Sequence, residues 1–143
     1  MLHLLVSGLL TLTDACIKNH REENDNTYSY LDDKVKIITY RNKGAFLGKG
    51  ESKPFVVTVI SVILTMLLSV VFVITLTTKG SRALRTGLSL ILGGAFSNTY
   101  DRLKKGYVVD YIVFSKAPGF IKNVVFNISD FAIIIGSLIM ALH

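Results

Sequence analysis

The segment PFVVTVISVILTMLLSVVFVITL, which runs from Pro54 to Leu76, contains no charged side chain. A helix of this length, at a rise of about 1.5 Å per residue, crosses the roughly 30 Å hydrocarbon core of a bilayer. The segment therefore predicts a membrane-spanning helix. Of the 143 residues, 50% are hydrophobic, and the mean hydropathy is +0.50, which is too apolar for an ordinary soluble domain. We expect a small integral membrane protein.

Three further apolar stretches predict helices of their own. The two that follow Leu76 carry their polar clusters towards one end, as expected where a helix end meets water or a paired site. The first stretch is short for a span and holds Asp14 near its end. To cross the bilayer it needs local bilayer thinning, or a Lys18 side chain that extends to the membrane surface. Together they predict a single membrane domain over residues 1–143, with helices at about 1–17, 54–76, 84–103 and 124–142 and an extramembrane segment at 19–53.

The formal net charge of +6 does not indicate a nucleic-acid-binding protein. The basic side chains lie in the polar intervals between the apolar runs, without a stripe along one helix or a nucleic-acid motif. A role at the membrane surface or in topology fits this pattern better. Four crossings would place the intervals 18–53 and 101–123 on one side of the membrane, so motifs in the two intervals can meet.

Three aspartates, Asp101, Asp110 and Asp130, are the only acidic residues after Pro54, and all lie beside apolar segments. An unpaired carboxylate at membrane depth costs roughly 2.5 to 3.5 kcal/mol, so such a residue indicates a site with a partner. Asn98 precedes Asp101 by three residues, and the same spacing occurs before Asp130, so each asparagine shares a helix face with its aspartate. Such a pair can hold a carboxylate or a substrate peptide group, or can simply cap a helix end.

Asp110 interrupts the apolar run Tyr107–Val113, and Asp130 is the nearest candidate partner. Asp130 would lie about six residues into the fourth helix, roughly 9 Å below its start. Two close carboxylates share a proton, which supplies a general base to activate water and a general acid to polarise a peptide carbonyl. This chemistry needs no metal, cofactor or nucleophilic side chain. Alternatively, Asp101 pairs with Arg102 and the other aspartates with nearby lysines, as structural ion pairs.

Five motifs in order along the chain resemble those of the bacterial lipoprotein signal peptidases, also called signal peptidase II. The longest runs from Gly93 to Arg102 and reads GGAFSNTYDR. The others are Asp14–Lys18, Thr39–Phe46, Gly106–Ile112 and Phe126–Asp130. The resemblance covers most of the chain.

The resemblance implies a mainly α-helical, integral membrane aspartic peptidase. Four transmembrane helices would carry a small extramembrane β-rich cradle between helices one and two, and a short surface helix within 113–123 between helices three and four. Asp110 and Asp130 match the catalytic pair of the family. The matching substrate-binding or supporting residues are Asn42, Gly44, Asn98, Asp101, Arg102, Asn127, Asp14 and Lys18. The resemblance implies no metal and no cofactor.

The family removes signal peptides from prolipoproteins by cutting before the diacylglyceryl-modified cysteine, so the resemblance implies this substrate. It also implies contact with membrane lipid, binding of the cyclic peptide globomycin and a bacterial cytoplasmic (inner) membrane location, multi-pass, with the active site at the outer face. We expect a monomer. The charge count opposes this orientation, because the two long intervals hold thirteen Lys and Arg and the loop 77–85 holds three, contrary to the positive-inside rule.

The chain departs from the family pattern at three places. Ala15 replaces the usual glutamine, a single Ala45 replaces two alanines, and Ser97 replaces a glycine at a predicted helix contact. None of these changes removes a catalytic side chain. One alternative is a catalytically silent relative that binds lipoproteins or peptidase partners. The other is a small ion-coupled transporter, although that class usually has more helices or an inverted repeat.

Overall fold

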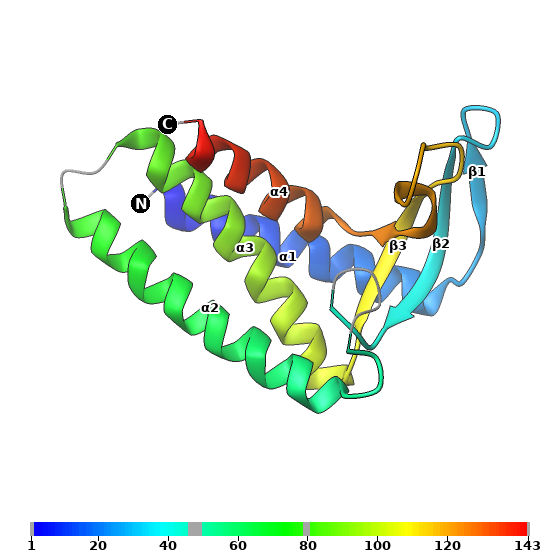
Figure 1. Ribbon diagram of the computed structural model, residues 1–143, viewed down its shortest axis with the longest axis horizontal. Helices are drawn as coiled ribbons and strands as arrows, with labels where there is room; N and C mark the ends of the chain where they lie inside the picture. Colours follow the sequence, from blue (N-terminus) through cyan, green and yellow to red (C-terminus); the bar gives the residue numbers. More distant parts are fainter. Residues whose placement is uncertain (1, 46–49, 79–80, 143) are drawn as a thin grey trace.

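A computed structural model describes residues 2–45, 50–78 and 81–142. Four helices form an elongated bundle, and a small sheet covers one end of it (Figure 1). The first turn of α1 and the last turn of α4 lie at the other end of the bundle. Phe46 of the second motif and part of the loop 77–85 lie outside the described residues. The elements in order are α1 Leu2–Glu23, β1 Tyr28–Tyr30, β2 Val35–Asn42, α2 Pro54–Thr77, α3 Arg82–Lys105, β3 Val108–Phe114, a 3-10 helix Ile121–Asn123, β4 Val125–Phe126 and α4 Ile128–Ala141.

Helix α3 lies at the centre of the bundle and packs against α1, α2 and α4. Its contact with α4 depends on small residues. A Cβ atom on Gly136 would lie 2.5 Å from the carbonyl oxygen of Gly87, and one on Gly94 would lie 2.5 Å from the carbonyl oxygen of Ser129. Small residues of this kind let helix backbones approach closely, which is how helices associate in lipid.

Among the described residues, α2 is the one helix that is both long and apolar enough to cross a membrane by length and composition. Helix α4 is apolar but has 14 residues, which is about 21 Å of helix. Helices α1 and α3 carry charged side chains over the turns nearest the sheet. The bundle is thus mainly helical as predicted, and three of the four spans stay predictions.

The sheet is antiparallel, with strand order β1-β2-β3-β4. The predicted β-rich segment 19–53 supplies only its first two strands. The other two come from the interval between α3 and α4, because the β-branched and aromatic run of β3 pairs with β2 along its length. Of the surface helix predicted within 113–123, the structure contains a single 3-10 turn at Ile121–Asn123.

Two helix ends also differ from the predicted bounds. Helix α1 continues past Ile17 to Glu23, because the polar residues that suggest an end to an apolar span find partners on α3 (described below). Helix α4 begins at Ile128 rather than near Val124, because the preceding residues pair with β3 as strand β4. Both changes bring polar side chains into the junction between the bundle and the sheet.

Candidate active site

Asn127 joins the sheet to α4 and caps that helix. Its side-chain oxygen accepts a hydrogen bond from the backbone N–H of Asp130 at 2.9 Å, and the Asp130 carboxylate accepts one from the backbone N–H of Asn127 at 3.0 Å. This reciprocal pair is a capping box. The capping interpretation and the site interpretation of this Asn–Asp spacing therefore apply to the same residues. Asp130 lies in the first turn of α4, not about six residues below its start.

The same asparagine connects the two predicted catalytic aspartates. Its amide nitrogen donates to the Asp110 carboxylate at 2.7 Å and to the side-chain oxygen of Asn98 at 3.1 Å. Asn98 in turn donates to Asp130 at 3.0 Å. The second oxygen of Asp110 accepts a hydrogen bond of 2.9 Å from Asn42, a diagonal neighbour on strand β2. Each carboxylate is thus held at both oxygens by fixed N–H donors.

Asp110 and Asp130 line the same cavity, of about 80 Å³, under the sheet. A cavity of this size has room for several water molecules, and its polar groups supply hydrogen bonds for them. Burial and, second, the charge of Asp130 together raise the pKa of Asp110 to about 7. The other lining residues are Asn42, Ala45, Asn98, Arg102, Val108, Val124, Val125 and Phe126.

Arg102 ties the segment after β2 to helix α3 beside the cavity. Its guanidinium donates to the carbonyl oxygen of Gly44 at 3.0 Å and to that of Asn98 at 3.3 Å. The backbone N–H of Gly44 donates to the side-chain oxygen of Asn42 at 2.9 Å, which leaves the Asn42 amide free to point at Asp110. The alternative in which Asp101 pairs with Arg102 is wrong, because Asp101 forms ion pairs with Lys18 and Lys105 instead.

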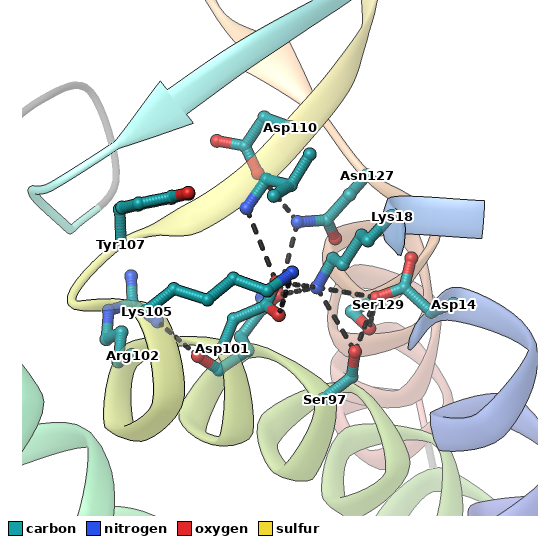
Figure 2. Close-up of polar contacts among 12 residues, drawn as sticks. Asp14, Lys18, Ser97, Asp101, Arg102, Lys105, Tyr107, Asp110, Asn127 and Ser129 are labelled. Atoms are coloured by element: carbon teal, nitrogen blue, oxygen red, sulfur yellow. Dashed lines mark hydrogen bonds and ion pairs between the residues drawn. The ribbon is translucent and has the colours of Figure 1, made fainter. Parts of the chain in front are cut away.

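Lys18 lies behind the cavity with no exposed surface, and Figure 2 shows its polar contacts. Its ammonium group lies 2.7 Å from Asp14 and 3.3 Å from Asp101. It also donates to Ser97 at 3.1 Å and to the side-chain oxygen of Asn98 at 2.8 Å. The ion pairs therefore connect to the cavity through Asn98.

The ion pairs between α1 and α3 continue outward to the surface. Lys105 lies 3.1 Å from Asp101 and 2.6 Å from Glu22. On α1, Asp14, Lys18 and Glu22 are spaced four residues apart, so all three share the helix face that meets α3. The side chains of the two helices alternate in charge along this contact, which explains why α1 stays helical to Glu23.

The structure brings all ten predicted site residues to two adjoining places. Asn42, Asn98, Arg102, Asp110 and Asp130 line the cavity. Asn127 bridges the carboxylates, and Gly44 contacts Asn42 and Arg102. The residues behind the cavity are Asp14, Lys18 and Asp101.

Sequence reasoning missed the hydroxyl groups that surround Asp14. Ser97, treated only as a replacement of glycine, donates to Asp14 at 2.6 Å, and Ser129 donates at 2.5 Å. Tyr111 donates to the other carboxylate oxygen at 3.0 Å. A signal was present, because Tyr111 and Ser129 each lie directly beside a predicted catalytic aspartate.

Comparison with known proteins gives the family. The family described as Signal peptidase (SPase) II matches residues 6–143. The lipoprotein signal peptidase of Halothermothrix orenii is 34% identical over 107 residues, 74% of this chain and 68% of the relative. That of Halalkalibacterium halodurans is 31% identical over 141 residues, 95% of this chain and 86% of the relative.

Solved structures share the fold. A bacterial membrane enzyme determined by the in meso method at 2.3 Å resolution superposes with a TM-score of 0.83 at 22% identity, covering 98% of this chain and 85% of that one. A second such structure, at 1.9 Å resolution, gives a TM-score of 0.78 at 20% identity, covering 98% of this chain and 90% of that one. With the family match spanning nearly the whole sequence, the chain belongs to the signal peptidase II family of membrane peptidases.

Proposed function

We propose that this chain is an aspartic endopeptidase that removes signal peptides from prolipoproteins, cutting before the diacylglyceryl-modified cysteine. The observation that carries the proposal is the pair Asp110 and Asp130, which line one cavity and are bridged by Asn127. The names of the relatives supply the substrate class. The arrangement of the two carboxylates supplies the chemistry.

Asp110 holds the proton that the pair shares, and Asp130 acts as the base. Asp110 is 3% exposed and its pKa lies near 7. The Asp130 carboxylate instead lies in the first turn of α4, where the helix dipole favours a negative charge. These different environments support Asp110 as the acid and Asp130 as the base, as in other carboxylate pairs with different surroundings.

The reaction follows from these protonation states. Asp130 takes a proton from a water molecule as the water oxygen attacks the peptide carbonyl carbon, and Asp110 gives its proton to the carbonyl oxygen. The tetrahedral intermediate then collapses. Asp130 passes its proton to the amide nitrogen, the C–N bond breaks, and Asp110 regains a proton from a hydroxyl of the intermediate.

The surrounding amides keep both carboxylates in this geometry. Asn42, Asn98 and Asn127 donate to the carboxylates at distances of 2.7 to 3.0 Å. Arg102 holds the backbone of Gly44 beside the cavity, where the substrate chain would pass. Prepositioned groups of this kind lower the cost of reaching the transition state.

We propose that all four helices cross the bacterial inner membrane and that the sheet lies at its outer face, where it meets a translocated substrate. The exposed apolar side chains of α2, such as Leu64 and Leu67, then contact lipid. The chain acts as a monomer and binds globomycin at the cavity. Globomycin should therefore raise the thermal stability of the protein by mass action.

Cleavage by the purified chain in lipid tests the proposal. The substrate is a diacylglyceryl-modified prolipoprotein, and the variants are Asp110→Asn and Asp130→Asn. Each should lower kcat at least a hundredfold, which is the usual scale of general acid–base catalysis. Asp33→Asn is the matched control, since Asp33 lies in the exposed β1–β2 turn, and it should cleave like the parent.

Two results would contradict the assignment. Cleavage that survives either dyad substitution would remove the pair as acid and base. A folded parent chain that binds the substrate without cleaving it would instead favour the catalytically silent relative.

A further inference from the structure

Tyr111 directly follows Asp110 on strand β3, and its side chain is almost fully buried. Successive side chains on a strand point to opposite faces. Asp110 therefore faces the cavity while Tyr111 faces the helices. The mechanism above does not use the Tyr111 hydroxyl, although it is the one polar group of a buried ring.

The hydroxyl of Tyr111 joins three elements. It donates to the Asp14 carboxylate of α1 at 3.0 Å and accepts from the backbone N–H of Ile128 at 3.2 Å. Ile128 is the first residue of α4, where backbone N–H groups have no partner within the helix. One hydroxyl thus links the residue after Asp110 to the backbone two residues before Asp130.

Asp14 also binds the residue beside Asp130. Ser129, which directly precedes Asp130, donates to the second oxygen of Asp14 at 2.5 Å. That oxygen also faces the Lys18 ammonium at 2.7 Å and the Ser97 hydroxyl at 2.6 Å. The carboxylate of Asp14 is therefore a fixed point on α1, to which the chain beside each member of the dyad is tied.

We propose that Tyr111 is a positioning residue whose hydroxyl, held between Asp14 and the N-terminus of α4, sets the separation of Asp110 and Asp130. This inference rests on the proposed function of the two carboxylates. Tyr111 is not among the residues that line the cavity, and it acts through the placement of its neighbours. A change of 1 Å in such a placement can cost about a hundredfold in rate.

Tyr111→Phe tests the proposal, because it removes the hydroxyl and keeps the buried ring. The matched control is Tyr107→Phe, whose hydroxyl donates to Glu22 at 2.7 Å, away from Asp14 and α4. With the diacylglyceryl-modified prolipoprotein, Tyr111→Phe should lower kcat roughly 10- to 100-fold and leave KM within about twofold. The basic limb of the kcat–pH profile of Tyr111→Phe should move to lower pH, because carboxylates held less closely repel each other less. Tyr107→Phe should match the parent in all three measurements.

Each other result overturns the proposal. An unchanged kcat, an equal loss in Tyr107→Phe, or a rise in KM alone would show that the hydroxyl does not position the pair. Failure of Tyr111→Phe to fold in lipid, where Tyr107→Phe folds, would assign Tyr111 a structural role only.

A second measurement keeps the test independent of cleavage. The Asp110 carboxyl band in the infrared spectrum, identified by its loss in Asp110→Asn, is titrated in the parent and in both tyrosine variants. Tyr111→Phe alone should move the midpoint towards the ordinary value of an aspartate. If the parent does not cleave but this shift occurs, the proposed function fails while the positioning role stands. If the shift is absent, the positioning role fails.

Discussion

Replacement of Lys18 by methionine should cost more stability than any single surface change in this chain. The ammonium group is fully buried and lies 2.7 Å from Asp14 and 3.3 Å from Asp101. Without it, Asp101 keeps Lys105 at 3.1 Å, but Asp14 keeps only hydroxyl donors among the described residues. One buried carboxylate is left without a counter-charge, which costs about 3 to 5 kcal/mol when a buried pair is broken.

The assay is equilibrium unfolding in mixed dodecyl maltoside and SDS micelles, followed by the near-ultraviolet circular dichroism of the tyrosines. Methionine is close to lysine in length, so the lost charge dominates the difference. Lys36→Met is the matched control, because the Lys36–Asp33 pair is exposed and its charged atoms are 4.0 Å apart. An exposed pair contributes at most about 1 kcal/mol.

A double variant separates the charge from packing. Asp14→Asn combined with Lys18→Met removes both charges and keeps an acceptor for the surrounding hydroxyls, so it should recover more than half of the lost stability. A loss below about 1 kcal/mol in Lys18→Met, or equal losses in Lys18→Met and Lys36→Met, would refute the reasoning. A double variant as unstable as the single one would refute it as well.

Three further predictions concern pH, helix packing and orientation. Burial and, second, the Asp130 carboxylate raise the pKa of Asp110 from 3.8 to about 7. The protonated form of Asp110 therefore stabilises the folded chain below about pH 4, and this contribution is lost as pH rises through 7. Unfolding measured across this range should show that slope in the parent, and the same slope in Asp110→Asn would contradict the assignment. Gly136→Val should lower stability by about 1 to 3 kcal/mol, since its Cβ would lie 2.5 Å from the Gly87 oxygen. Gly8→Val is the control, because there is open space around Gly8. Equal thermal unfolding temperatures of the two variants would refute this prediction. Asp33→Cys, in a background without the native cysteine, should react with a membrane-impermeant thiol reagent in intact cells, and labelling only after the cytoplasm is opened would reverse the proposed orientation.

The sequence predicts α2 well because its signal is local. The apolar run Pro54–Leu76 needs no partner to be recognised as a span, and its observed helix ends at Thr77. Strand β3 is harder, because Tyr107–Val113 has the composition of either a strand or a buried helix until β2 is placed beside it. The meeting of Asp110 and Asp130 follows from the motifs, but their bridge through Asn127 depends on β4 ending one residue before the cap.

The limits of sequence reasoning are clearest at α1. Asp14 and Lys18 suggest the polar end of a short span, while their ion pairs and hydrogen bonds to α3, some eighty residues away in the chain, keep the helix going to Glu23. The same holds for the Asp14 hydroxyl cluster, since its members come from α3, β3 and α4. Only the packed structure shows that separate positions share one carboxylate.

The alternating charges between α1 and α3 predict the order in which the helices insert during synthesis. Alone in lipid, α1 would expose Asp14 and Lys18 with few partners, at a cost of several kcal/mol. Asp101, the ion-pair partner of Lys18 on α3, leaves the ribosome only after α2 has been made. On the proposed four-span topology, we expect the first helix to wait at the membrane surface or beside the insertion machinery until α3 arrives, and the two helices to enter the bilayer as a pair. A chain truncated before Asp101 should be a substrate for membrane quality-control proteases.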